Sequence, residues 1–144
     1  MRLETKSDQE TERKVAEHMS VVWKCDYSSM GPYSPYDICF TRKGVLSAIA
    51  EIKDRTNRER DTYPTVCLNL DKWFTLIQCE LFLGKPAFYI VQFKDGIYFL
   101  RIGEVEINQY KISYKGRVDR GEKNDQRLAV DIPSELFKAV KENP

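Results

Sequence analysis

Two acidic residues and one lysine stand where they could bind a metal ion and act on a phosphate. Asp37 lies in a β-rich segment, and Glu51 and Lys53 close the apolar segment that follows Gly44. If the two segments pair as a hairpin around Gly44, with partners whose numbers add up to 88, Asp37 lies directly opposite Glu51. Directly opposed residues share one face of a sheet, and a residue two positions further shares it too. The spacing therefore predicts that both carboxylates and the amine of Lys53 meet.

Two facing carboxylates need positive charge, because like charges opposite each other in a sheet are destabilising. A hard divalent cation supplies that charge: proteins typically hold Mg²⁺ with one or two carboxylates, waters and phosphate oxygens. The backbone carbonyl of Ile52 is a candidate third ligand, and Lys53 would position or activate the attacking water. The pattern predicts a Mg²⁺-dependent site, with Mn²⁺ as a substitute, for hydrolysis at a phosphate group.

The segment before this hairpin is predicted to contribute a further acid. A helix over 8–19 follows a polar, frayed stretch at 1–8. Glu12 lies on its apolar face, which is formed at helical spacing by Val15, Ala16 and Met19. A purely amphipathic role for this glutamate is the competing interpretation.

The remaining patterns predict an α/β (α+β) fold with a mixed central sheet flanked by helices, in a single domain over 1–144. Its core would span about 9–102, with an added strand and helix extension at 103–144. The predicted elements are a strand at 20–26, a loop at 27–35, a mobile polar loop at 54–64, a strand at 65–70, a helix between 71 and 84, a hairpin of 87–93 and 97–102, strands at 104–115 and 128–132 with a charged loop between them, and a short helix from 134.

Two of these elements carry specific signals. Asp95-Gly96 between apolar, β-branched and aromatic runs predicts a tight hairpin turn. For the helix between 71 and 84, Asp71 is the expected N-cap and Gly84 the expected C-terminal residue. Its buried face is expected to consist of Trp73, Phe74, Ile77 and Leu81.

Composition excludes several other classes of function. The formal net charge is only +1, so any basic surface must come from local segregation of charge. His18 is the only histidine, which excludes a His-rich metal site, and the four cysteines lack C-x-x-C spacing and are expected to be buried free thiols. No apolar run approaches the ~20 residues of a transmembrane helix, and no signal peptide is recognisable. We expect a soluble, cytoplasmic protein without a membrane partner.

These motifs resemble the PD-(D/E)XK nuclease superfamily. The resemblance covers about residues 9–93 and rests on Pro35 and Tyr36 before Asp37, followed by Glu51-Ile52-Lys53 on the next strand. One departure is that the proline stands two residues before Asp37 rather than beside it. Within the superfamily, the chain is most similar to Holliday-junction-resolvase-like members, on two short stretches: Glu12-Arg13 followed by Val15, and Ser28-Ser29-Met30-Gly31.

The resemblance implies a restriction-endonuclease-like core in which Asp37, Glu51, Lys53 and Glu12 are catalytic. It also implies that Glu12 joins the metal ligands, that DNA is the partner, and that the enzyme acts on branched DNA in recombination or repair as a homodimer.

The candidates for DNA contact are Arg55, Arg58, Lys72 and Ser29. The two arginines could bind phosphates, although acidic neighbours make a solvated loop an equal interpretation. Lys72 stands at a helix start, where a phosphate could bind, or it is a surface lysine.

Two other functions stay open: a non-catalytic nucleic-acid-binding or interaction module, and a sequence-specific restriction-type endonuclease.

Overall fold

A mixed six-stranded sheet forms the centre of the computed structural model, which describes residues 6–31, 34, 36–115 and 127–141. The strand order is β1-β2-β3-β5-β6-β9, and only the pair β3–β5 is parallel. The bounds are β1 Asp26–Ser29, β2 Ile38–Arg42, β3 Val45–Arg55, β5 Ala87–Phe93, β6 Gly96–Arg101 and β9 Lys138–Ala139. This mixed α+β architecture confirms the predicted fold class.

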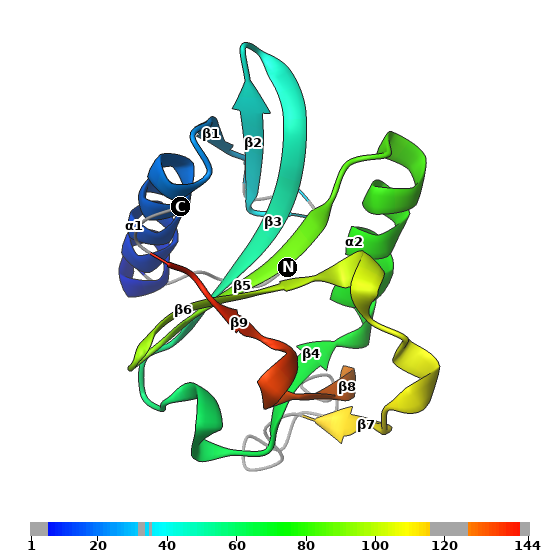
Figure 1. Ribbon diagram of the computed structural model, residues 1–144. Coiled ribbons are helices and arrows are strands. Elements are labelled where there is room, and N and C mark those ends of the chain that lie inside the picture. Colours follow the sequence, from blue (N-terminus) through cyan, green and yellow to red (C-terminus); the bar gives the residue numbers. More distant parts are fainter. Residues whose placement is uncertain (1–5, 32–33, 35, 116–126, 142–144) are drawn as a thin grey trace.

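Two helices and a smaller sheet complete the architecture (Figure 1). The helices are α1 Lys6–Val22 and α2 Leu70–Leu83. The smaller sheet has the order β4-β8-β7, with bounds β4 Thr65–Asn69, β8 Arg127–Pro133 and β7 Ile112–Lys115. Short 3₁₀ turns occupy η1 Arg60–Thr62, η2 Ile102–Glu104, η3 Ile107–Gln109 and η5 Ser134–Leu136.

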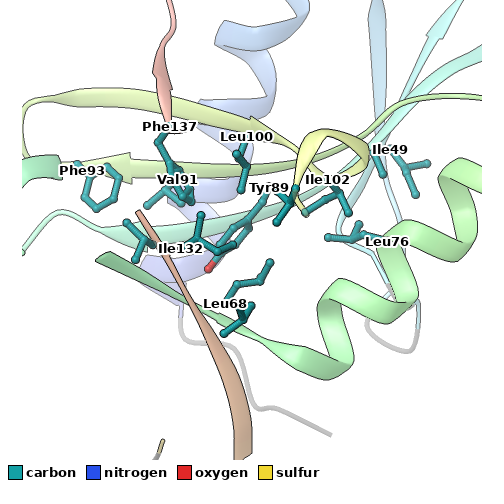
Figure 2. Packing of buried hydrophobic residues seen from close by; sticks show 14 residues of the cluster. Ile49, Leu68, Leu76, Tyr89, Val91, Phe93, Leu100, Ile102, Ile132 and Phe137 are labelled. Atoms are coloured by element: carbon teal, nitrogen blue, oxygen red, sulfur yellow. The ribbon is translucent and has the colours of Figure 1, made fainter. Parts of the chain in front are cut away.

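The central sheet is covered on both faces, and the alternation along β3 decides which side chains face which helix. Ala50 and Ile52 pack with α1, whose buried stripe is Val15, Ala16 and Met19 as predicted. Ile49 belongs to the other cluster, shown in Figure 2, with Leu76 of α2 and residues of the smaller sheet. Because successive strand residues alternate, Glu51 and Lys53 share the face of Ile49. The site residues of β3 therefore lie on the α2 side.

The hairpin of β2 and β3 has the predicted register at its site end, for a reason that the sequence did not reveal. Lys43 and Gly44 have φ values of 51° and 77°, so a two-residue turn pairs Arg42 with Val45. A bulge then leaves Ser47 as the extra residue. Beyond the bulge, the pairs are those predicted: Phe40 with Ala48, Cys39 with Ile49, and Ile38 with Ala50.

The strand predicted at 20–26 is wrong, because α1 continues to Val22. The amide of Trp23 still donates to the Met19 carbonyl (2.8 Å), and the Trp23 ring packs edge-on against Phe40 at 5.3 Å between centroids. The first strand starts only at Asp26 and lies partly in the predicted loop at 27–35. Tertiary contacts of the indole outweigh the local alternation of apolar residues.

The C-terminal segments also differ from the prediction. Of the strand expected at 104–115, only β7 is extended, and the helix expected from 134 is the turn η5 followed by β9. Ser134 is tied to the preceding loop, since its amide donates to the Pro64 carbonyl (2.9 Å) and its hydroxyl to the Tyr63 carbonyl (2.7 Å). Phe137 is fully buried in the core. The extension thus contributes to the core; residues 116–126 of the expected charged loop lie outside the described residues.

One hairpin turn, one polar loop and the four cysteines follow the sequence predictions to different degrees. The Asp95-Gly96 hairpin is confirmed between β5 and β6. The polar loop at 54–64 is shorter than predicted, because β3 extends to Arg55 and η1 forms within it. All four cysteines are free, but Cys67 is exposed and the other three are half-buried rather than buried.

Helix α2 has different caps and a different buried face from those expected. Its N-cap is Asn69, whose side chain accepts from the Asp71 amide at 3.1 Å, so Asp71 lies in the first turn instead. Gly84 is confirmed as the left-handed C-cap (φ 65°). Leu76 is the fully buried residue of α2, and two of the predicted residues, Trp73 and Ile77, are partly buried and pack against the same core cluster. The other two predicted residues, Phe74 and Leu81, are 52% and 73% exposed. The helix is rotated relative to the prediction because its neighbours contact the side that carries Leu76.

We expect Asn69→Ala to lower the free energy of unfolding by about 1 kcal/mol, because the first turn of α2 loses its side-chain acceptor. Asp71→Ala should cost less, since that residue offers only a charge near the helix N-terminus. Urea denaturation of both variants measures the difference. A larger loss for Asp71→Ala would contradict the assignment of the cap.

Candidate active site

The carboxylate of Asp37 is fixed against β3 at the end of the hairpin. The Asp37 amide donates to the Ala50 carbonyl at 3.1 Å, and its side-chain Oδ2 accepts from the Ile52 amide at 2.9 Å. The Met30 amide donates to the Asp37 carbonyl at 2.8 Å, so the loop before Asp37 is held as well. The N–H and C=O of a strand residue point to the same edge. The Ile52 carbonyl therefore faces the same edge as the Asp37 carboxylate.

Glu51 is a buried carboxylate between two lysines. Its exposed fraction is 3%. Lys53 Nζ lies 3.6 Å from Glu51 Oε1, and Lys72 Nζ, from α2, lies 3.2 Å from Glu51 Oε2. Burial raises the pKa of Glu51, and the negative charge of Asp37 raises it further, while Lys53 and Lys72 oppose the shift. The site therefore favours added positive charge, which the two ammonium groups supply in part.

The raised pKa of Glu51 should make the metal-free protein less stable as pH rises. The folded state holds this proton at pH values where the unfolded chain has lost it. The free energy of unfolding therefore decreases as the pH rises from about 4.5, the ordinary pKa, to the raised pKa of the folded state. Glu51→Gln removes this dependence. Urea denaturation between pH 4 and 8, with a chelator present, should show the wild type losing stability relative to the variant. Parallel pH profiles would contradict the shift.

Glu12 of α1 and Ser29 of β1 lie at the same cavity as Asp37. These three residues line one cavity of about 400 Å³, together with Gln9, Arg13, Met30, Gly31 and Ser34. Glu51 and Lys53 are not among its lining residues. Among the described residues, no group of three or more His, Cys, Asp or Glu side chains is close enough to hold a metal ion. Glu12 thus shares a cavity with Asp37, and Asp37 lies close enough to Glu51 for their charges to interact. The three acids do not form one cluster in the described part of the chain.

The donors around Asp37 nevertheless fit a hard divalent cation. Two carboxylates and a backbone carbonyl are the oxygen ligands that Mg²⁺ prefers. The buried Glu51 carboxylate, with a pKa raised by its surroundings, would gain from a cation at this point. Asp37, Glu51 and the Ile52 carbonyl are therefore the residues that could hold Mg²⁺ or Mn²⁺.

The four candidates for DNA contact lie in different places. Lys72 contacts Glu51 directly. Ser29 is the last residue of β1 and lines the same cavity as Asp37. The Arg58 guanidinium lies 5.1 Å from the Tyr63 ring centroid and 5.6 Å from that of Phe93. Cation–π contacts of this kind favour a structural role for Arg58. Arg55 donates to the Asp54 carbonyl at 2.9 Å.

Sequence analysis missed the contributions of Gln9, Arg13 and Ser34 to the cavity. Helical spacing gave the signal for Gln9, which stands three residues before Glu12, on the same side of α1. It also missed that Lys72 reaches Glu51, because that contact joins α2 to β3 across the chain. Pro35, part of the motif before Asp37, lies outside the described residues.

Comparison with known proteins identifies the family. A family model described as phage putative PDDEXK endonuclease matches residues 1–140. The chain belongs to this family. The resemblance to PD-(D/E)XK nucleases is thereby confirmed, and the protein is a member of a nuclease family. No curated protein sequence matches the chain significantly.

Solved structures share the fold of this family member. Hjc, a Holliday junction resolvase from Archaeoglobus fulgidus, is 13% identical, with a TM-score of 0.58 and coverage of 94% of this chain and 93% of that one. D212, a nuclease from a fusselovirus, is 15% identical, with a TM-score of 0.59 and coverage of 99% and 92%. At this identity the likeness concerns the fold. Within the described residues, no helix is long and apolar enough to span a bilayer.

Proposed function

We propose that this protein is a Mg²⁺-dependent endonuclease that hydrolyses phosphodiester bonds of DNA. The observation that carries the proposal is the buried Glu51 carboxylate, which lies near Asp37 and 3.6 Å from the amine of Lys53. Two acids and a lysine close to one another match the chemistry that phosphodiester cleavage requires. Membership in a nuclease family supports the same activity.

The chain's own residues have distinct tasks in this proposal. Asp37, Glu51 and the Ile52 carbonyl hold the cation, with Glu12 as a further acid at the cavity of Asp37. A cation held there would lower the pKa of a water molecule and offset charge on the phosphate. Lys53 orients the attacking water and stabilises negative charge as it develops on the phosphate. Mn²⁺ substitutes for Mg²⁺ because the ligands are oxygens.

A panel of labelled DNA substrates tests the proposal. Duplex, single strand, flap and four-way junction are incubated with Mg²⁺ or Mn²⁺, and cleavage is compared between wild type and Glu51→Ala. Lys94→Ala, at an exposed hairpin position, is the matched control. Cleavage that is lost in Glu51→Ala alone supports the enzyme. Binding without cleavage in the wild type would favour a non-catalytic nucleic-acid-binding module. A wild type that neither binds nor cleaves DNA would overturn the DNA assignment.

A preference for branched DNA, and a homodimeric enzyme, are the finer parts of the proposal. The overall likeness to a Holliday junction resolvase supports them, since a two-fold enzyme suits a symmetric junction. In the panel, the four-way junction should be cut faster than plain duplex. Equal cleavage rates on the four-way junction and on plain duplex would contradict this preference. Cleavage at one defined sequence would favour a restriction-type enzyme.

Lys72 should contribute less than Lys53. Its amine neutralises Glu51 in the structure, and in the enzyme–DNA complex we expect it to contact a phosphate. Lys72→Met should lower the cleavage rate about 10-fold, the factor for ~1.4 kcal/mol of lost charge stabilisation. Single-turnover rates measure the change. A rate equal to that of the wild type would assign Lys72 a purely structural role.

A further inference from the structure

Helix α2 exposes an apolar face that no other described part of the chain covers. This outer face of α2 consists of Phe74, Gln78, Leu81 and Phe82, and all four are exposed. Its apolar members are 52%, 73% and 85% exposed in chain order. The spacing i, i+4, i+7, i+8 is that of one continuous helix stripe. In Figure 1, α2 lies at the margin of the molecule, beside the sheet.

The outer face is self-complementary about Gln78. When two copies of α2 lie antiparallel across a two-fold axis at Gln78, contacting positions have numbers that add up to 156. Phe74 then meets Phe82 of the second copy, and Asp71 at the helix start meets Lys85 just beyond the helix end. Each contact occurs twice, as a two-fold interface requires.

The charges at the two ends are available for such pairing. Within the described part of the chain, no ion pair includes Asp71 or Lys85. Asp71 is exposed and Lys85 is half-buried. An antiparallel arrangement brings these opposite charges together at both ends of the interface, whereas a parallel arrangement would bring like charges together. The charge pattern therefore selects the antiparallel orientation.

We propose that the outer face of α2 binds a second copy of this chain, with the two α2 helices antiparallel and crossing at Gln78. The inference specifies the surface of the homodimer and rests on that part of the proposed function. The first turn of each α2 lies next to the candidate active site, because its Lys72 contacts Glu51. A 14-residue helix is about 21 Å long, so the dimer would hold the two sites near opposite ends of the helix pair.

The exposed area is of the right order for such an interface. With about 150–250 Å² per whole aromatic side chain, the outer face offers on the order of 500 Å² of apolar surface. A stable interface buries about 800 Å² on each partner, so the polar rim around the helix pair must supply the remainder. We therefore expect a dimer with a dissociation constant in the micromolar range, about 1 to 50 μM.

Analytical ultracentrifugation of the full chain, without DNA or divalent metal, tests the surface. Across about 1 to 200 μM, the wild type should pass from monomer to dimer, with the dissociation constant in the range given above. Leu81→Glu should weaken the dimer at least about 10-fold, because it places two charges in the interface. Val21→Glu, at a position 74% exposed on α1, is the matched control and should leave association unchanged. A wild type that stays monomeric, or an undisturbed Leu81→Glu dimer, would overturn the proposal.

A charge exchange tests the orientation and does not depend on the apolar variant. Asp71→Lys alone and Lys85→Asp alone should each weaken association, about 3-fold or more, while the double variant should restore it towards the wild type. Only the antiparallel pairing predicts this rescue, so a double variant no better than the single ones would overturn it. Nuclease activity is measured separately, and a normal dimer without cleavage would count against the proposed function alone.

Discussion

Lys53→Met and Glu51→Gln are each expected to lower the rate of DNA cleavage by at least about 10³-fold, the size typical for loss of a group that stabilises developing charge. The Lys53 amine lies 3.6 Å from Glu51, so removing it deletes a positive charge directly at the site. Glu51→Gln keeps the shape of the side chain but removes a negatively charged ligand from the proposed cation site. Single-turnover cleavage of the preferred substrate measures both losses.

The control for these variants is Lys94→Met, at an exposed position in the turn of the β5–β6 hairpin. It should cleave like the wild type. Both site variants should retain the circular dichroism spectrum and DNA binding of the wild type, so that the lost rate reports chemistry. If Lys53→Met and Glu51→Gln cleave within about 10-fold of the wild type, Asp37, Glu51 and Lys53 do not form the active site.

Mg²⁺ or Mn²⁺ is expected to stabilise the folded protein, because the repulsion between Asp37 and Glu51 exists only when the chain is folded. A ligand at 100 times its dissociation constant adds about 2.7 kcal/mol to the free energy of unfolding. Urea denaturation at neutral pH, with and without saturating metal, measures this gain. Asp37→Asn and Glu51→Gln should each remove most of it.

Two further variants make the metal experiment specific. Glu10→Gln changes an exposed acid that pairs with Lys14, and it should keep the full gain. Glu12→Gln tests whether the acid in the cavity of Asp37 binds the ion: a reduced gain would include it among the ligands. Equal stabilisation of wild type and Asp37→Asn would refute a metal site at the hairpin.

Local patterns predicted the parts of the fold whose contacts are close in sequence. The Asp95-Gly96 turn, the stripe of α1 with Val15 and Met19, and the C-cap at Gly84 all follow from the conformations that these residues prefer. Patterns failed where a distant partner decided the conformation. Trp23 packs against Phe40 and extends α1, and the loop carbonyl of Tyr63 binds Ser134 where a helix was expected.

The sequence by itself determined which acids and which lysine lie along the β2–β3 hairpin, and that Asp37 falls beside the stretch of β3 that carries Glu51. Pairing around one turn is a local property, and even the bulge at Ser47 preserved the outcome. Only the tertiary structure decided that Glu51 is buried, that Lys72 reaches it from α2, and that Glu12 shares a cavity with Asp37. It also decided which side of α2 faces outward. Burial, charge balance and helix rotation depend on contacts between elements far apart in the chain, which periodicity along one segment does not encode.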